Sequence, residues 1–232
     1  MAHFVFMLTH DDRTVDSAAE IMPTLADTGL RYVGFKDVGA DLAKQRELVS
    51  LAHDAGFEVM LEVVSTSKEA EMSSLRSAAQ AGFDWVLGGT HGAETAGMLP
   101  DGVKYCPFPV RVVDHPSVLL GSIDEIAADA ERLTALDHVS GLDLLAYRHP
   151  TADVLDLIRK VTASSSGPVI VAGSIASIDR AVAVGEAGAW GYTIGSAIFD
   201  GLLPGAPTIA NQVRRVLEKT ASAADTSPET RT

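Results

Sequence analysis

The feature that most constrains the fold is a regular alternation between short apolar runs and longer segments with helical periodicity. Short runs rich in β-branched residues predict strands, and the stretches between them have the spacing of amphipathic helices. The predicted strands are residues 3–8, 31–35, 57–64, 84–87, 110–113, 139–146, 168–172 and 190–194. The predicted helices are residues 15–28, 41–55, 67–81, 123–136, 152–163, 178–187 and 208–220.

The strands are continuous apolar runs rather than alternating ones, as in residues 168–172 (PVIVA). Such runs indicate parallel strands that are covered on both faces. Parallel strands joined by helices form either an open doubly wound sheet or a closed barrel. The length of 232 residues and the number of strand–helix units favour an α/β fold with a single (β/α)8 TIM barrel over residues 1–220. Residues 221–232 are polar and aperiodic, so we expect a disordered C-terminal tail.

The middle of the chain is the least regular part of this pattern. Pro107 and Pro109 are poorly suited to a central strand, so the fifth strand is predicted after them, at residues 110–113. The next helix has a clear start, because Ser122 and Glu125 have the spacing of a capping box.

The charge balance bears on partners. The chain has 31 acidic and 18 basic residues, a formal net charge of -13, which disfavours nucleic acid and anionic membranes as partners. A small anionic ligand remains compatible, because backbone N–H groups and one or two cations are enough to bind it. No apolar stretch has the length of a secretory leader or a membrane span, so we expect a cytoplasmic protein. The single cysteine, Cys106, excludes an internal disulfide, and we expect an ordinary buried thiol.

Two Gly-Ser pairs follow the last two predicted strands. Gly173-Ser174 comes after strand seven and Gly195-Ser196 after strand eight. Glycine lets a backbone N–H approach an anion closely, and a following helix start adds donors and a favourable dipole. One Gly-Ser is also a common turn, but two at equivalent positions at the ligand-binding face of a barrel predict a phosphate site. Two turns without a ligand are the alternative.

Residues 168–175 and 191–198 resemble the phosphate-binding half of the ribulose-phosphate-binding barrels. That superfamily includes isomerases of histidine and tryptophan biosynthesis, ribulose-phosphate epimerase, N-acetylmannosamine-6-phosphate epimerase and the 2-keto-3-deoxy-6-phosphogluconate aldolases. The motifs cover roughly the last quarter of the chain, and the first half matches no single family. The resemblance implies a barrel, a phosphorylated small-molecule substrate and an assembly of two or more subunits.

Lys36 and Glu62 are the leading catalytic candidates. Lys36 ends an apolar strand, where a lysine can form a Schiff base or transfer a proton. Glu62 is embedded among apolar residues and is suited to acid–base chemistry. A purely structural ion pair between Lys36 and Glu62, or between Lys36 and Asp37, is the alternative.

Other strand ends supply further candidates. Asp11 is predicted as a second base in preference to Asp12, because Asp12-Arg13-Thr14 resembles an ordinary loop before a helix. His91 follows Gly-rich residues and is expected in a flexible loop that reaches over a ligand. Arg148 is expected either to clamp a second anionic group or to be an exposed loop arginine. His10 and His149 rank below these. The side chains of His10, Asp11, Glu62 and His91 are of types that bind divalent metals. No two of them are a few residues apart in a ligand pair such as H-x-x-x-H, so neither a metal nor a cofactor is predicted.

Three functions remain open. The first is an isomerase or epimerase of a phosphorylated sugar or sugar derivative, in which Lys36, Glu62 and Asp11 share proton transfer next to a carbonyl and the phosphate orients the substrate. The second is a Schiff-base lyase of aldolase type that uses Lys36. The resemblance places the aldolases' reactive lysine on strand six, where this chain has residues 144–147 (LLAY). The third is a non-catalytic barrel that binds a phosphorylated metabolite, favoured if Lys36 and Glu62 only neutralise each other.

Overall fold

The computed structural model describes residues 2–65, 67–114, 116–203 and 208–226, and in them the chain forms a (β/α)8 barrel. Eight parallel strands make one sheet, in the order β10-β11-β12-β1-β4-β5-β6-β7. Their bounds are β1 His3–Met7, β4 Tyr32–Lys36, β5 Glu58–Val63, β6 Trp85–Gly88, β7 Lys104–Cys106, β10 Leu142–Leu144, β11 Val169–Val171 and β12 Gly191–Ile194. The two ends of this order meet, because the amides of Ser140 and Asp143 donate to the carbonyls of Tyr105 (2.7 Å) and Pro107 (3.1 Å).

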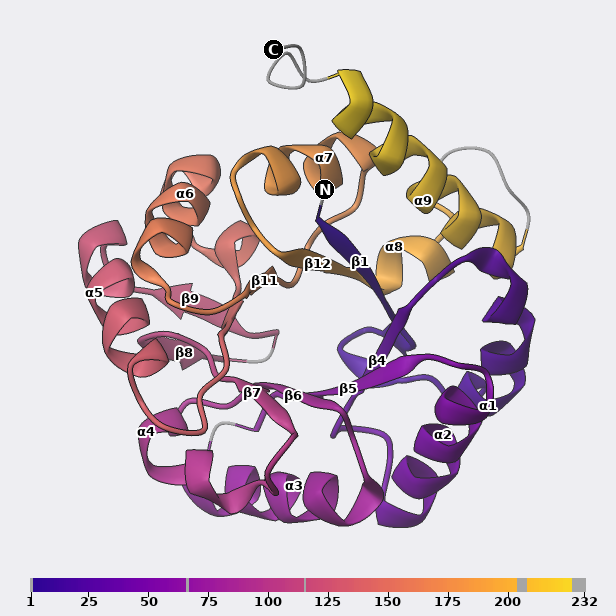
Figure 1. Ribbon diagram of the computed structural model, residues 1–232, viewed down its shortest axis with the longest axis horizontal. Helices are drawn as coiled ribbons and strands as arrows, with labels where there is room; N and C mark the ends of the chain where they lie inside the picture. The colour runs from indigo at the N-terminus through magenta and orange to yellow at the C-terminus, as the bar shows by residue number, and fades with distance from the viewer. Residues whose placement is uncertain (1, 66, 115, 204–207, 227–232) are drawn as a thin grey trace.

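The helices form an outer ring around the strands (Figure 1). Their bounds are α1 Ala18–Ile21, α2 Leu42–Asp54, α3 Lys68–Ala81, α4 Gly92–Thr95, α5 Ile123–Thr134, α6 Val154–Ser164, α7 Ile178–Glu186, α8 Ser196–Phe199 and α9 Ile209–Thr226. Short 3-10 turns are η1 Met22–Thr28, η2 Ala96–Met98 and η3 Ala146–Arg148. The predicted capping box is confirmed: Glu125 Oε2 accepts from the Ser122 amide (2.7 Å), and Ser122 Oγ accepts from the Glu125 amide (3.3 Å).

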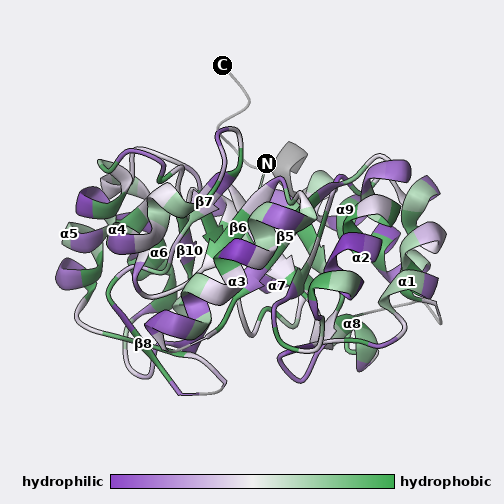
Figure 2. Ribbon diagram, turned by 90° about the horizontal axis from the view of Figure 1, so that it is seen from below, coloured by the Kyte–Doolittle hydropathy of each residue, from purple (hydrophilic) through white to green (hydrophobic). Residues whose placement is uncertain are grey.

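The core has two layers, which follow from the alternation of side chains along each strand. On β5, Leu61 packs outward under the helices, whereas Met60 points into the barrel. The strands at the centre of the molecule are mostly apolar, and the polar residues of the helices lie toward the outside (Figure 2). The inward apolar cluster consists of Val5, Met7, Tyr32, Met60, Trp85, Leu87, Cys106 and Ile170.

The prediction for strand five was wrong. The barrel strand is β7, which lies before the prolines, and residues 111–113 form β8 (Arg111–Val113) in an antiparallel hairpin with β9 (Val118–Leu120). Pro107 ends the barrel strand rather than preceding it, because proline has no N–H to donate to a neighbouring strand. An apolar run that we assigned to the barrel is therefore a hairpin on the side of the molecule where α8 lies (Figure 2).

The predicted tail boundary was also too early. Helix α9 continues through residues 221–226, whose alanines favour helix, and the remaining residues 227–232 lie outside the described residues.

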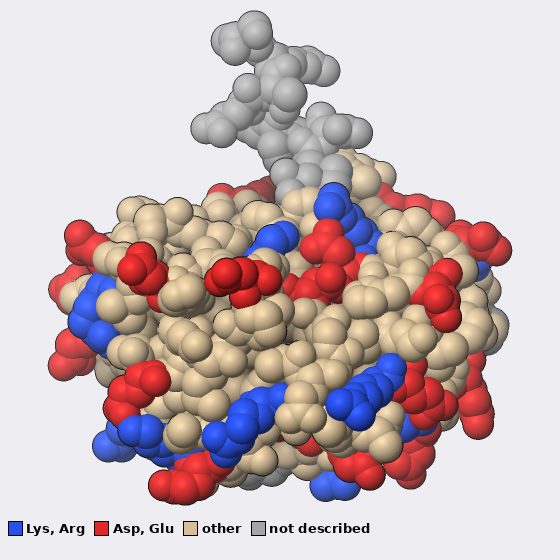
Figure 3. Space-filling view, turned by 60° about the horizontal axis from the view of Figure 1, so that its bottom comes forward, with Lys and Arg blue, Asp and Glu red and all other residues tan. Residues whose placement is uncertain are grey.

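Among the helices described, none combines the length and the apolar character needed to cross a bilayer. On the face shown in Figure 3, Lys and Arg side chains lie beside Asp and Glu side chains, and uncharged residues cover most of the surface.

Candidate functional site

A cavity of about 160 Å³ lies at the carboxyl ends of the strands. Its wall includes residues that follow β1, β11 and β12 and residues on β4 and β5, so segments far apart in sequence meet there. This is the end of the barrel where ligands bind in such folds. The polar residues that line it are Thr9, Asp12, Lys36, Glu62, Arg148, Ser174, Thr193, Ser196 and Asp200.

Lys36 and Glu62 come together because β4 and β5 pair in register. Lys36 lies directly opposite Glu62 in this parallel pair, so both side chains point to the same side of the sheet. Their neighbours Phe35 and Leu61 pack outward in the core, which directs Lys36 and Glu62 inward. Lys36 Nζ is 3.6 Å from Glu62 Oε2, and each side chain is 5% exposed. The structure thus brings the two leading candidates into one cavity.

Asp12, not Asp11, is the carboxylate that reaches Lys36. Both residues have positive φ angles (48° for Asp11 and 56° for Asp12), so the chain reverses tightly after β2 (Thr9–His10). Asp12 Oδ1 lies 2.5 Å from Lys36 Nζ. Asp11 is 87% exposed and pairs with His10, so Asp12, and not the Asp11 that we preferred, lines the cavity. The reason is the direction of the turn, which sends one side chain inward and its neighbour outward.

Arg148 completes the charged group. Its two terminal nitrogens donate to both carboxylate oxygens of Asp12, at 3.1 and 3.0 Å. Burial by itself raises the pKa of Asp12, but the hydrogen bonds from Arg148 and the charge of Lys36 outweigh it and lower the pKa to about 2. Asp12 is therefore ionised at neutral pH and neutralises cations on both sides of it.

The two Gly-Ser pairs lie in the wall of the same cavity. Gly173 and Ser174 have positive φ angles of 78° and 58°, and a Cβ on Gly195 would lie 2.6 Å from Thr9 Oγ1. Among the described residues, no hydrogen bond is made by the backbone N–H groups of Gly173, Ser174, Gly195 and Ser196. A Cβ on Gly173 would overlap with Arg148 Nε, so the guanidinium lies against this loop. Free N–H groups beside a cation suit an anion.

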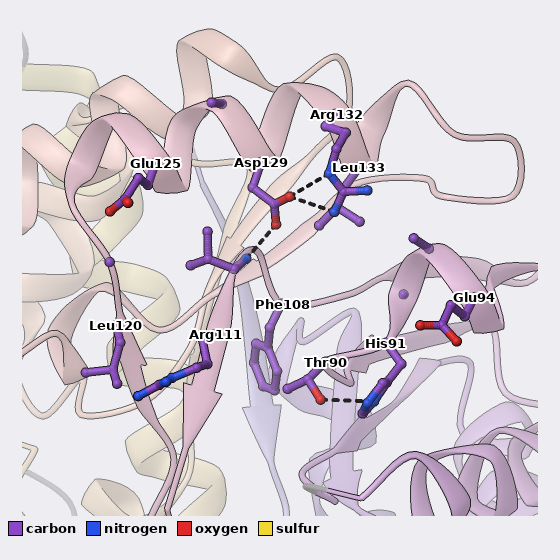
Figure 4. Close-up of a pocket in the computed structure, with 15 residues that line it drawn as sticks. Thr90, His91, Glu94, Phe108, Arg111, Leu120, Glu125, Asp129, Arg132 and Leu133 are labelled. Carbon is purple, nitrogen blue, oxygen red and sulfur yellow. Dashed lines mark hydrogen bonds and ion pairs between the residues drawn. The ribbon is translucent and has the colours of Figure 1, made fainter.

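His91 belongs to a different part of the molecule. Its Nδ1 lies 2.9 Å from Oε2 of the fully buried Glu71, which also accepts from the amide of Thr90 (2.8 Å). Its ring borders a groove of about 840 Å³ between α4 and α5. Figure 4 shows His91 and Thr90 on one side of this groove, opposite Asp129 and Arg132 of α5. His91 is therefore not among the residues that line the cavity of Lys36, and the loop that we expected to be flexible is anchored by Glu71.

The other histidines have local partners. His149 Nε2 donates to the carbonyl of Gly121 (2.7 Å), and its Nδ1 accepts from the amide of Ala152 (2.9 Å). His10 Nε2 is 2.8 Å from Asp200 Oδ1, and this hydrogen bond raises the pKa of His10. Of the residues considered as metal ligands, only His10 and Asp11 are paired with each other, and the described part of the chain has no group of three metal-ligating side chains. Cys106 is fully buried, as expected, and burial raises the pKa of its thiol.

Sequence reasoning missed Asp143. This residue lies on β10 between two leucines and is completely buried. An acidic residue inside an apolar strand was the signal that singled out Glu62, and the same signal was present in Leu142-Asp143-Leu144. The charge of Glu62 acts on Asp143, as do those of Lys36 and Arg148, so Asp143 adjoins the same cluster.

The comparisons with known proteins agree on the architecture. No protein-family model and no curated protein matches the chain. Orotidine 5'-phosphate decarboxylase from Pyrococcus horikoshii is 15% identical with a TM-score of 0.68, covering 94% of this chain and 99% of its own. The tryptophan synthase alpha chain from Legionella pneumophila is 14% identical (TM-score 0.59; 98% and 93% covered).

A third similar structure is a truncated 3-deoxy-D-arabino-heptulosonate 7-phosphate synthase from Thermotoga maritima. It is 14% identical with a TM-score of 0.62, covering 97% of this chain and 87% of its own. These likenesses concern the fold, and they extend the barrel implied by the last quarter of the sequence to nearly the whole chain. In fold, the protein is a (β/α)8 barrel.

Proposed function

We propose that the protein is an isomerase or epimerase that transfers a proton next to the carbonyl of a phosphorylated sugar or sugar derivative. The observation that carries the proposal is the division of partners at Lys36. Asp12 takes the short contact with its ammonium group at 2.5 Å, whereas Glu62 stands at 3.6 Å. Within the described residues, the Glu62 carboxylate accepts no hydrogen bond, so it is the carboxylate able to act as a base.

Each step of such a reaction has a residue suited to it. Glu62 takes the proton from the carbon beside the carbonyl, and the electron pair moves onto the carbonyl oxygen. The ammonium group of Lys36 stabilises that developing oxyanion. In an isomerisation, Glu62 returns the proton to the former carbonyl carbon, while the hydroxyl proton on the first carbon moves to the oxyanion and the hydroxyl oxygen becomes the new carbonyl oxygen. In an epimerisation, Glu62 loses its proton to solvent, and a solvent proton adds to the opposite face of the first carbon as the carbonyl re-forms. Asp12 and Arg148 hold Lys36 in place, because three charged groups are tied together at the cavity wall.

The anchor is the pair of Gly-Ser loops. The phosphate would accept hydrogen bonds from the free N–H groups of residues 173–174 and 195–196, with the guanidinium of Arg148 alongside. Binding energy gained at the phosphate then orients the reacting carbons toward Glu62. Two of the three similar structures have a phosphorylated compound in their names, which supports this class of substrate.

The second candidate is a Schiff-base lyase, because Lys36 lines the cavity. A nucleophilic lysine must direct its nitrogen at the substrate carbonyl, whereas Lys36 Nζ already contacts two carboxylates within 3.6 Å. The third candidate, a barrel that only binds a ligand, requires Glu62 to serve only as the ion-pair partner of Lys36. The shorter contact of Lys36 is with Asp12 instead. Both arguments favour proton transfer.

The experiment is proton NMR in D₂O with pentose, hexose and amino-sugar phosphates, which follows enzyme-dependent loss of a C–H signal beside the carbonyl. We expect exchange with one compound class and a loss of about 10²–10⁴-fold in Glu62→Gln. Glu131→Gln, on the exposed face of α5, is the matched control and keeps the wild-type rate. No exchange with any compound that binds overturns the proposal. Borohydride trapping of substrate on Lys36, identified by mass spectrometry, would then establish the lyase.

A further inference from the structure

Asp143 is an acidic residue that is completely buried inside the barrel and has no role in the proposed reaction. Its relative exposure is 0%, and neither carboxyl oxygen has a hydrogen-bond partner among the described residues. An ionised carboxylate without partners is very costly in such a place. A carboxyl group there is stable when it carries a proton.

The register of β10 shows where Asp143 points. Asp143 lies opposite Ile170 of β11, whose side chain belongs to the inward cluster. Its neighbours Leu142 and Leu144 pack in the outer layer under the helices. Because side chains alternate along a strand, Asp143 points into the barrel, as Lys36 and Glu62 do.

The charged groups around Asp143 come from several strands. Glu62 on β5 repels a charge on Asp143, whereas Lys36 on β4 and Arg148 at η3 attract it. Cys106 on β7 faces it as a buried thiol, while the facing residues on β6 and β11, Leu87 and Ile170, are apolar. Burial first, and the charge of Glu62 second, raise the pKa of Asp143 well above its ordinary value.

The charges of the cluster balance without Asp143. Lys36 and Arg148 supply two positive charges, and Asp12 and Glu62 supply two negative charges. A charged Asp143 would add an unbalanced negative charge to the interior of the barrel. Within the described part of the chain, Glu62 and Asp143 are the carboxyl groups of this cluster without a hydrogen bond, so one proton shared between them keeps the charges balanced.

We propose that this proton resides on Asp143, and that Asp143 is a positioning residue which, by remaining neutral, keeps Glu62 ionised and available as the base. The inference rests on the proposed role of Glu62. Glu62 has Lys36 at 3.6 Å to stabilise its charge, whereas Asp143 has no donor, so the proton is better placed on Asp143. As the pH rises and Asp143 loses its proton, the added charge disfavours a second carboxylate beside it.

The test is the pH dependence of stability in wild type and Asp143→Asn, which needs no substrate. A raised pKa means that the folded chain binds a proton that the unfolded chain has released, so stability falls as the pH rises from about 4 to the pKa of the folded state. Above about pH 5, and up to the pKa of Asp143 in the folded state, we expect the wild-type folding equilibrium constant, from urea unfolding, to fall relative to that of Asp143→Asn by about tenfold per pH unit. Asp101→Asn, an exposed aspartate, is the control and keeps the wild-type slope.

If the ratio of the folding equilibrium constants of wild type and Asp143→Asn is constant over this pH range, the proposal is overturned. It is also overturned if the pH slope remains in Asp143→Asn but disappears in Glu62→Gln. If Asp143→Asn does not fold, infrared spectroscopy of wild type with ¹³C-carboxyl-labelled aspartate gives the same answer. A labelled C=O band of a protonated carboxyl at neutral pH is expected, and its absence overturns the proposal. The alkaline limb of the D₂O-exchange rate should also move in Asp143→Asn. If no substrate C–H exchanges in D₂O but stability still falls with pH as expected, the proposed reaction is refuted and the protonated Asp143 is not.

Discussion

The ammonium group of Lys36 lies closer to Asp12 than to Glu62, with Nζ 2.5 Å from Asp12 Oδ1 and 3.6 Å from Glu62 Oε2. Arg148 donates two hydrogen bonds to the same Asp12 carboxylate. Asp12 thus holds the two cations of the cavity, although it comes from a turn and they come from β4 and η3. This arrangement leaves the Glu62 carboxylate without a hydrogen bond among the described residues.

Asp12 should make the protein sensitive to acid. Its pKa is lowered to about 2 in the folded state, so its stabilising contribution is present above the ordinary pKa of about 4 and is lost as the pH falls toward 2. The shift corresponds to roughly 2 kcal/mol of unfolding free energy. Urea unfolding between about pH 5 and pH 2 checks this against Asp12→Asn, which should lose that part of the pH dependence. An unchanged pH dependence in the variant would contradict the assignment.

Gly195→Ala should weaken phosphate binding. The new Cβ would lie 2.6 Å from Thr9 Oγ1 and 2.9 Å from Thr9 O, so the loop with its free N–H groups has to move. We expect at least a tenfold rise in the dissociation constant of inorganic phosphate, or about 1.4 kcal/mol, by isothermal titration calorimetry. Gly97→Ala is the control, because a Cβ there meets nothing within 4 Å. Equal affinity in both variants would argue against this loop as the anchor.

Glu71→Gln should loosen the loop that carries His91. The carboxylate accepts from the amides of Thr90 (2.8 Å) and His91 (3.2 Å), and a glutamine nitrogen cannot replace an accepting oxygen. The loss of one such bond in a buried place costs about 1–3 kcal/mol. Amide hydrogen exchange at residues 90 and 91 should accelerate, and the midpoint of urea unfolding should move to a lower urea concentration. Glu69→Gln, exposed on the same helix, should leave both measurements unchanged.

Asp200→Asn should lower the pKa of His10 toward its ordinary value. The hydrogen bond that His10 donates to Asp200 is the main cause of the raised pKa, and the charge of Asp11 contributes less. Proton NMR of the imidazole over a pH series measures the shift. Asp11→Asn should give a smaller fall, and a larger one would reverse this assignment. Because the pKa is raised, the His10–Asp200 contact stabilises the fold below the ordinary pKa and weakens as the pH rises past it.

The barrel was predictable because its evidence is local. Each apolar run and each helical period appears within a few residues, and the pairing order follows from parallel topology. The position of Lys36 and Glu62 in the cavity was predictable for the same reason, since a charged residue inside an apolar strand stands out in the sequence. Asp143 carried that signal and was missed.

The remaining site residues depend on tertiary geometry. The choice between Asp11 and Asp12 follows from two positive φ angles, which adjacent aspartates do not announce. His91 was misplaced because its anchor, Glu71, lies on a different element, α3. Strand five was misplaced because prolines both end strands and precede turns, so the apolar residues on either side of them were equally suitable.

The cavity wall is built partly from the paired strands β4 and β5 and partly from connections between elements. The spacing of Lys36 and Glu62 is set by adjacent strands in register, whereas Asp12, Arg148 and the Gly-Ser loops belong to connections between elements. Connections tolerate insertion and exchange far better than paired strands do. Protein engineers can therefore graft new loops onto this scaffold to alter which ligand enters, while the lysine–glutamate pair stays as a fixed module that successive variants inherit.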